Sequence, residues 1–246
     1  MVGVQESNGG GGGSNQMHGL VEFDVTEARQ RISDYEAETD ERLSFTAFVT
    51  RCLAQAVEEF PRVQAYRDWR GNLVQSADVD VMVMVEHTTD GERVALPHVV
   101  KAANRRSLRS IHDDIRETQE SSTDGQRPRR PSMIAQLPGP ARRLIYRLAP
   151  QLWNSISGTV AVSSVGMFST GSGWAISPSY HTLQLTVGGI AEKPVLVDGE
   201  VEPREYLNIT VTLDHDVVDG APAARFVERL KELIESAQAI EPTSES

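Results

Sequence analysis

The feature that most constrains the fold of this sequence is a strand pattern followed at once by a helix pattern near the C-terminus. In residues 207–213, apolar side chains alternate with polar ones, which is the period of a strand with one buried face. In residues 221–236, apolar side chains recur at helical spacing along one stripe. Gly220 lies between the two patterns. A strand and a helix that each bury one face must pack on other elements, so we predict a layered α/β domain.

Other segments carry local signals of the same kinds. Ser44 is a typical helix N-cap and Pro61 is a helix stop, so residues 44–60 are predicted to be a helix. Further helices are expected after Thr26 and over residues 107–120. Strands are expected at residues 21–25, 63–67, 72–75, 79–86, 93–100, 159–163 and 182–187. Strands interleaved with a few helices again indicate an α/β layered architecture.

The chain is predicted to contain one domain between two tails. Residues 1–19 include five consecutive glycines and little apolar content, so we expect a flexible tail there. Residues 20–238 are predicted to form a single domain, which is a sufficient length for a substantial core. Residues 239–246 are predicted to be a second tail.

Composition and charge argue against several classes of protein. The formal net charge of -11 argues against general nucleic-acid binding, which depends on excess Lys and Arg. No apolar run approaches the ~18 residues of a membrane span, and the N-terminus lacks the pattern of a secretory signal. Cys52 is the one cysteine, so a disulfide within the chain is impossible. These features predict a cytoplasmic protein.

His215 is the candidate catalytic residue. It follows the alternating segment directly, and continuing the period of two from Leu213 places it on the apolar face, partly shielded. A histidine titrates near neutral pH and is suited to proton transfer. Two alternatives stay open, which are a histidine that only satisfies hydrogen bonds at a strand end, and a metal ligand. No second histidine stands at ligand spacing, so no metal site is predicted.

The run DHDVVDG at 214–220 resembles the histidine motif of a known superfamily, in which three residues separate a histidine from Asp-Gly. The superfamily contains chloramphenicol acetyltransferases and the catalytic domain of the acyltransferase component of 2-oxo-acid dehydrogenase complexes. The resemblance continues, in the family's order, at LSFTAFVTRCLAQAVEEFPRVQA (43–65), LPHVVKAANRRSL (96–108), GTVAVSSVGMF (158–168) and 183–234. Ordered matches along residues 20–236 are more specific than one short motif.

The resemblance implies a mixed β-sheet flanked by helices, assembled as homotrimers or a higher multiple, with the active site between neighbouring subunits. It implies that CoA or acyl-CoA is a substrate and that His215 removes the proton of a thiol. Ser163 matches the residue whose hydroxyl stabilises the oxyanion, and Ser164 would face the other way in a regular strand. Asp219 is expected to pair with an arginine, either Arg29 or Arg31. The resemblance assigns no residue to CoA binding.

This sequence departs from the family in three places. Asp216 stands where the dehydrogenase-complex enzymes usually have arginine. The short segment before residue 20 has no room for a lipoyl domain, so a lipoyl group would have to come from another protein. Residues 128–157, with a cationic amphipathic stretch at 140–153, are predicted to be an insertion.

Three hypotheses about function follow from the resemblance. The first is acyl transfer between CoA and a dihydrolipoyl thiol supplied in trans. The second is a small-molecule O- or N-acetyltransferase with the same chemistry. The third is a non-catalytic trimeric assembly protein, although the presence of His215, Ser163 and Asp219 argues against it.

Overall fold

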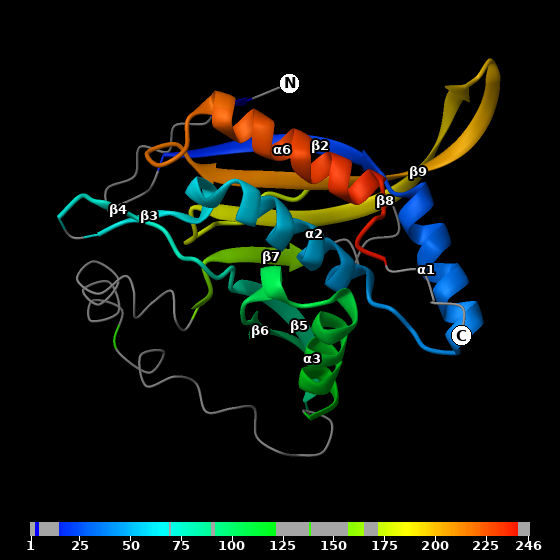
Figure 1. Ribbon diagram of the computed structural model, residues 1–246, viewed down its shortest axis with the longest axis horizontal. Helices are drawn as coiled ribbons and strands as arrows, with labels where there is room; N and C mark the ends of the chain where they lie inside the picture. Colours follow the sequence, from blue (N-terminus) through cyan, green and yellow to red (C-terminus); the bar gives the residue numbers. More distant parts are fainter. Residues whose placement is uncertain are drawn as a thin grey trace.

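The computed structural model describes residues 3–4, 15–68, 70–89, 92–121, 138, 157–164 and 172–240. Its centre is a β-sheet of seven described strands in the order β1-β2-β9-β8-β7-β5-β6 (Figure 1). These strands are β1 (Gly3–Val4), β2 (Gln16–Asp24), β5 (Val81–Thr89), β6 (Glu92–Val100), β7 (Val160–Ser164), β8 (Leu183–Val197) and β9 (Glu200–Asp214). β7 runs parallel to β8 and β5, and the other neighbours are antiparallel. The predicted mixed sheet is therefore confirmed.

Helices cover one face of this sheet, as Figure 1 shows. They are α2 (Phe45–Glu59), α3 (Leu108–Ser121) and α6 (Gly220–Glu235), with α1 (Thr26–Thr39) beside α6. Ser44 caps α2, because its side chain accepts a hydrogen bond from the Ala47 amide at 3.3 Å. Phe48 on α2 and Phe226 on α6 are fully buried in the core between helices and sheet. The helices expected from local patterns are thus present.

The opposite face of the sheet is polar. Thr186 on β8 and both Asn208 and Thr210 on β9 point to this side and are completely buried. Residues 172–180 cross the face in irregular conformation, and Ser177 hydrogen-bonds Thr186 at 2.9 Å. Burial of polar side chains is tolerated here because most of them find hydrogen-bond partners in the crossing segment or the neighbouring strands. This face carries the candidate oxyanion residue.

β8 and β9 form one long hairpin that extends beyond the rest of the sheet (Figure 1). Its tip contains Asp198 at φ 51° and Gly199 at φ 90°. Positive φ at both central residues matches the right-handed twist of the strands, and Asp-Gly suits this turn. Nearer the core, β8 has an irregularity between Val187 and Ile190, where a Cβ on Gly188 would collide with the carbonyl oxygen of Gly173.

Four predictions from the sequence need correction or fall outside the described residues. Residues 61–64 form a 3-10 helix, η1 (Pro61–Gln64), and only Tyr66–Arg67 is a strand, β3, which pairs with β4 (Leu73–Val74). Residues 16–19 belong to β2 rather than to a tail, because their backbone pairs with β9. Ile240 is buried in the core, so the C-terminal tail cannot begin at 239. The stretch 140–153 lies outside the described residues.

Candidate active site

His215 is the first residue after β9, and the chain turns sharply there. The amides of Val217 and Val218 both donate to the Asp214 carbonyl oxygen, at 3.1 and 2.9 Å. The imidazole is exposed, in contrast to the prediction that it lies partly shielded on the apolar face. That prediction was wrong because the period of two ends with the strand, at Asp214. The exposed ring is accessible to a substrate.

A half-buried carboxyl, that of Asp214, lies beside this histidine in sequence. Burial raises the pKa of the Asp214 carboxyl, although the Asp216 amide, which donates to it at 3.0 Å, lowers that pKa, as do the charges of Arg67 and His215. The carboxylate accepts a hydrogen bond from the turn that carries His215, so Asp214 contributes to the shape of this turn.

Ser163 lies on β7, half-buried, and belongs to the polar face of the sheet. The register pairs it with Thr186 of β8, which pairs in turn with Thr210 of β9. Ser164 is paired with Val187 and therefore points to the helical side, as expected for alternating side chains. The hydroxyl of Ser163 is thus directed away from the core of its own subunit.

The register also sets the distance between Ser163 and His215 within one chain. Thr210 stands in line with Ser163, and His215 follows it by five residues. Five residues of strand span about 17 Å, and two inter-strand spacings add about 10 Å in the perpendicular direction. The two Cα atoms are therefore roughly 20 Å apart, which is beyond the reach of both side chains. A single chain does not bring these two residues together.

Asp219 precedes α6 and is exposed. Among the described residues, none forms a hydrogen bond or an ion pair with its carboxylate. The expected arginine partner is absent, because Arg29 pairs with Glu205 at 2.7 Å and Arg31 pairs with Glu27 at 2.7 Å. Both arginines of α1 therefore pair with other carboxylates, and the predicted pairing with Asp219 was wrong.

Two other arginines contact the His215 turn, and the sequence interpretation missed them. Arg62 and Arg67 donate hydrogen bonds to the carbonyl oxygens of Val217 and Asp216. No local pattern could have indicated these contacts, because each joins residues about 150 positions apart through a backbone atom.

The model of the 2-oxoacid dehydrogenases acyltransferase (catalytic domain) family matches residues 15–129 and 153–241. The chain belongs to this family. The match is interrupted at residues 130–152, within the segment 128–157 that we predicted to be an insertion.

Individual relatives of this acyltransferase domain agree with the family match. The lipoamide acyltransferase component of the branched-chain alpha-keto acid dehydrogenase complex of Bacillus subtilis is 28% identical over 223 residues, covering 88% of this chain and 46% of the relative. The chain thus spans about half the length of this curated relative.

Solved structures show that the acyltransferase domain shares its fold with known enzymes. A dihydrolipoamide acetyltransferase from Azotobacter vinelandii, studied for the role of a serine, a histidine and an asparagine in its catalytic mechanism, superposes with a TM-score of 0.68 and 21% identity. The alignment covers 92% of this chain and 84% of that one. A chloramphenicol acetyltransferase superposes with a TM-score of 0.54 and 14% identity, covering 89% and 88% of the two chains. The expected chloramphenicol acetyltransferase-like fold is confirmed.

Other reactive groups of the acyltransferase domain offer no competing centre in the part of the chain that the structure describes. Cys52 is buried, and burial raises the pKa of its thiol to about 12, so a nucleophilic thiolate does not form near neutral pH. No three His, Cys, Asp or Glu side chains of the described ranges gather to hold a metal ion. No described helix has the length and apolar character of a membrane span.

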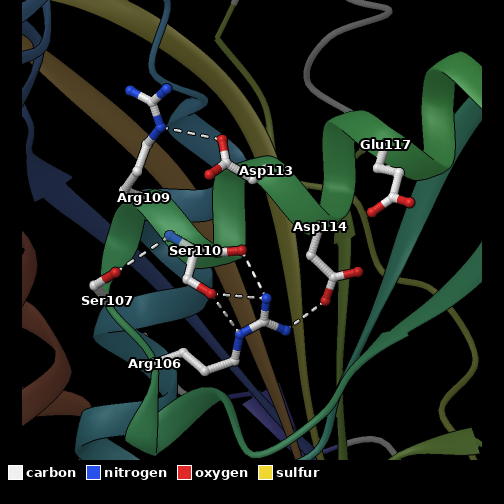
Figure 2. A pocket seen from close by; sticks show the side chains of 7 residues that line it. All are labelled: Arg106, Ser107, Arg109, Ser110, Asp113, Asp114 and Glu117. Carbon is white, nitrogen blue, oxygen red and sulfur yellow. Dashed lines mark hydrogen bonds and ion pairs between the residues drawn. The ribbon is translucent and has the colours of Figure 1, made fainter.

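A polar pocket lies on α3, away from His215 and Ser163. Figure 2 shows the charged and hydroxyl side chains that line it, which are Arg106, Ser107, Arg109, Ser110, Asp113, Asp114 and Glu117. Arg106 pairs with Asp114, and Arg109 pairs with Asp113 and Glu41. Both arginines are thus already engaged by carboxylates. We therefore assign the pocket a structural rather than a catalytic role.

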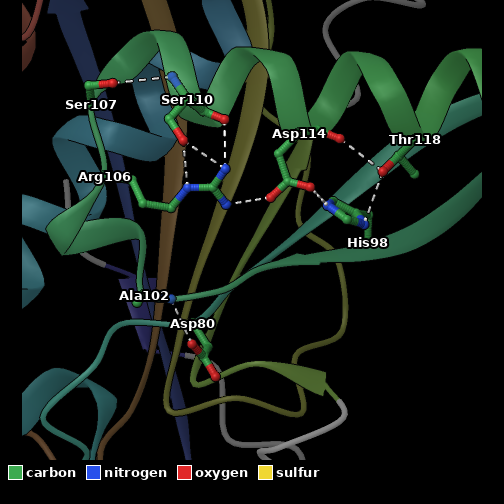
Figure 3. A network of polar contacts seen from close by, with 8 residues as sticks. All are labelled: Asp80, His98, Ala102, Arg106, Ser107, Ser110, Asp114 and Thr118. Atoms are coloured by element: carbon green, nitrogen blue, oxygen red, sulfur yellow. Dashed lines mark hydrogen bonds and ion pairs between the residues drawn. The ribbon is translucent and has the colours of Figure 1, made fainter.

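Asp114 of this pocket also joins α3 to the edge strand β6. In Figure 3, the Asp114 carboxylate lies between Arg106 and His98, with His98 Nε2 at 3.0 Å. Thr118 is 3.3 Å from the other ring nitrogen of His98. The order hydroxyl, imidazole, carboxylate resembles a hydrolytic triad, but the Thr118 hydroxyl is also 2.9 Å from the Asp114 carbonyl oxygen, to which it donates. The network therefore fastens β6 to the helix.

This network leads to a prediction about stability. Asp114→Asn should lower the free energy of unfolding by about 1–3 kcal/mol, because Arg106 and His98 lose a shared and largely shielded carboxylate. Urea unfolding of the two proteins measures this change. Asp113→Asn is the matched control, since its pair with Arg109 is exposed and should contribute less than about 1 kcal/mol. Equal effects of the two substitutions would contradict the assignment.

Proposed function

We propose that this chain is a CoA-dependent acyltransferase that moves an acyl group between CoA and a dihydrolipoyl thiol presented by another polypeptide. One observation carries the proposal. The serine, histidine and asparagine studied in the catalytic mechanism of the Azotobacter vinelandii enzyme have the same separations along that chain as Ser163, His215 and Asp219 have here. Asp219 differs in type from the asparagine, but the proposed base and hydroxyl are of the same kind.

The proposed chemistry follows from these residue types. A free thiol has a pKa of about 8.5, so a general base accelerates its attack near neutral pH. His215 removes the thiol proton, and the thiolate sulfur attacks the thioester carbonyl to give a tetrahedral oxyanion. The Ser163 hydroxyl donates a hydrogen bond to that oxyanion. When the intermediate collapses, the carbon–sulfur bond to the leaving thiol breaks, and His215 returns the proton to it.

The proposal requires two copies of the chain at each site. His215 and Ser163 are roughly 20 Å apart within one subunit, and Ser163 points away from its own core. A neighbouring copy related by cyclic symmetry can supply the missing partner at every site, and a homotrimer or a multiple of it satisfies this requirement. We therefore propose that the site forms between His215 of one subunit and Ser163 of the next.

Asp219 has a supporting role in this proposal. Its carboxylate stands at the N-terminal end of α6, where the helix dipole favours a negative charge. Its carbonyl oxygen accepts the Ala223 amide at 3.1 Å, which begins the helix directly after the His215 turn. We propose that it stabilises the start of α6 and thereby the end of the turn.

Transfer to a small molecule is the second candidate function. It is favoured by Asp216, which replaces the arginine usual in the dehydrogenase-complex enzymes. Neither transfer needs a metal ion, and in the first candidate function we propose that a separate protein carries the dihydrolipoyl group. We propose the cytoplasm as the location, where a free thiol such as the buried Cys52 persists.

A comparison of acceptors tests the proposed function. Purified protein is incubated with acetyl-CoA or a branched acyl-CoA and with one acceptor at a time, either dihydrolipoamide or one of a set of alcohols and amines. The acylated product and free CoA are then separated and quantified. We expect dihydrolipoamide to be acylated at a rate at least about tenfold above that of alcohols and amines, since its thiol is the better-matched nucleophile. Faster acylation of an alcohol or amine would select the second candidate. No transfer to any acceptor would reject both.

A further inference from the structure

We infer that Arg62 and Arg67 are positioning residues for the catalytic base, which rests on the proposed function of His215. Arg62 Nε donates to the Val217 carbonyl oxygen at 3.0 Å. Arg67 Nη2 donates to the Asp216 carbonyl oxygen at 2.8 Å. The two carbonyl groups belong to the two residues directly after His215, so the arginines hold the turn that carries the imidazole.

Other hydrogen bonds restrain the same turn through its amide groups. The amides of four consecutive residues, His215 to Val218, are already hydrogen-bonded. His215 donates to the Asn15 carbonyl oxygen at 2.6 Å, and the other three donate to the carboxylate or the carbonyl oxygen of Asp214. The arginines act on the opposite side of the same peptide units. Together the contacts restrain the backbone on both sides of each peptide, which limits where the imidazole can point.

The segment that carries the two arginines is itself packed against the rest of the protein. Between them, Val63, Gln64 and Ala65 are buried. Gln64 Oε1 accepts the Thr159 hydroxyl at 2.7 Å, and the Ala65 carbonyl oxygen accepts the Thr182 hydroxyl at 2.5 Å. Thr159 and Thr182 immediately precede β7 and β8. The segment 61–67 therefore connects the sheet, including the strand that carries Ser163, to the His215 turn.

Arg67 has an electrostatic effect as well. Its charge lowers the pKa of the Asp214 carboxyl, against the burial that raises it. This carboxyl is the acceptor for the Asp216 amide. Arg67 therefore supports the turn both directly, through a carbonyl group, and indirectly, through this carboxylate.

The test measures kcat and KM separately in the full-length protein. We expect Arg67→Gln and Arg62→Gln each to lower kcat by about tenfold, because small displacements of a catalytic group have large effects on rate. KM for acyl-CoA should stay within about twofold, since the arginines contact backbone and not substrate. Arg67→Lys should recover kcat to within about threefold of the parent, as its ammonium can still donate to the Asp216 carbonyl oxygen. Arg70 lies in the turn between β3 and β4, close in sequence to Arg67. Arg70→Gln removes the same charge and should leave kcat and KM unchanged.

A second readout is independent of acyl transfer. Hydrogen exchange of the amides of residues 215–218 should accelerate in Arg67→Gln, while exchange in the middle of α6 stays as in the parent. Unchanged exchange together with unchanged kcat would overturn the inference, as would a raised KM with normal kcat, which would make the arginines substrate ligands. If the parent transfers no acyl group, the proposed function fails, but the exchange experiment still decides whether the arginines hold the turn.

Discussion

His215→Ala should reduce acyl transfer by about a thousandfold or more, because the attacking thiol then has no base to take its proton. The substitution should leave folding intact, since the imidazole is exposed and the turn is held by hydrogen bonds of its backbone. The measurement is the initial rate of S-acyl product formation at saturating substrates, with thermal unfolding of the same samples as the check on folding.

His215→Gln is the second variant for this position. Glutamine fills similar space and can form hydrogen bonds, but it cannot accept a proton near neutral pH. The two variants should therefore lose activity to a similar extent. A rate near that of the parent in either variant would eliminate His215 as the base, and a glutamine variant with most of the activity would reduce its role to hydrogen bonding.

Ser163→Ala should lower kcat by about a hundredfold, which is the typical loss when one donor to an oxyanion is removed. Ser164→Ala is the matched control on the same strand, because that side chain points toward the helices. Its kcat should stay within about threefold of the parent, since it cannot reach a site on the polar face. Equal losses in the two variants would indicate a general disturbance of β7 instead.

Mixed assemblies of the two inactive variants test whether the site lies between subunits. Each variant supplies what the other lacks, so co-expression of His215→Ala and Ser163→Ala chains with different affinity tags should give hybrids with some complete sites. In a closed trimer that contains both variants, one of the three interfaces is complete, so doubly tagged trimers should recover about one third of the parental rate. Recovery no greater than the mean of the two variants would place both residues in one subunit's site, contrary to the register of the sheet.

Much of the fold could be predicted because its signals are local. The cap at Ser44, the stripe of α2 and the alternation in β9 each depend on residues within one or two turns or a single strand. The predicted strand at 63–67 is correct only at Tyr66–Arg67, because Val63 and Gln64 belong to the 3-10 helix η1. These two residues are buried beside Thr159 and Thr182, which precede β7 and β8. The outer part of the β8–β9 hairpin was missed although Asp198-Gly199 is a recognised turn signal, since its strands have no buried face to reveal them.

The candidate site divides in the same way. His215 and Asp219 could be chosen from a motif that occupies seven consecutive residues, and Ser163 from ordered resemblance along the chain. The expected partner of Asp219 could not be chosen correctly, because Arg29 pairs with Glu205 of a distant strand, which the sequence does not place in space. Arg31 pairs with Glu27 four residues earlier on the same helix. The exposure of His215 likewise depends on where β9 ends.

The sequence alone determined the layered class, the main helices and strands, and the residue types available for acyl transfer, because periodicity and short motifs are properties of neighbouring positions. The tertiary structure alone decided the strand register that separates Ser163 from His215, and the contacts by which Arg62 and Arg67 hold the turn. Such features arise when distant segments pack together, and a hydrogen bond to a backbone carbonyl group can be made to any residue, so it leaves no mark in the sequence.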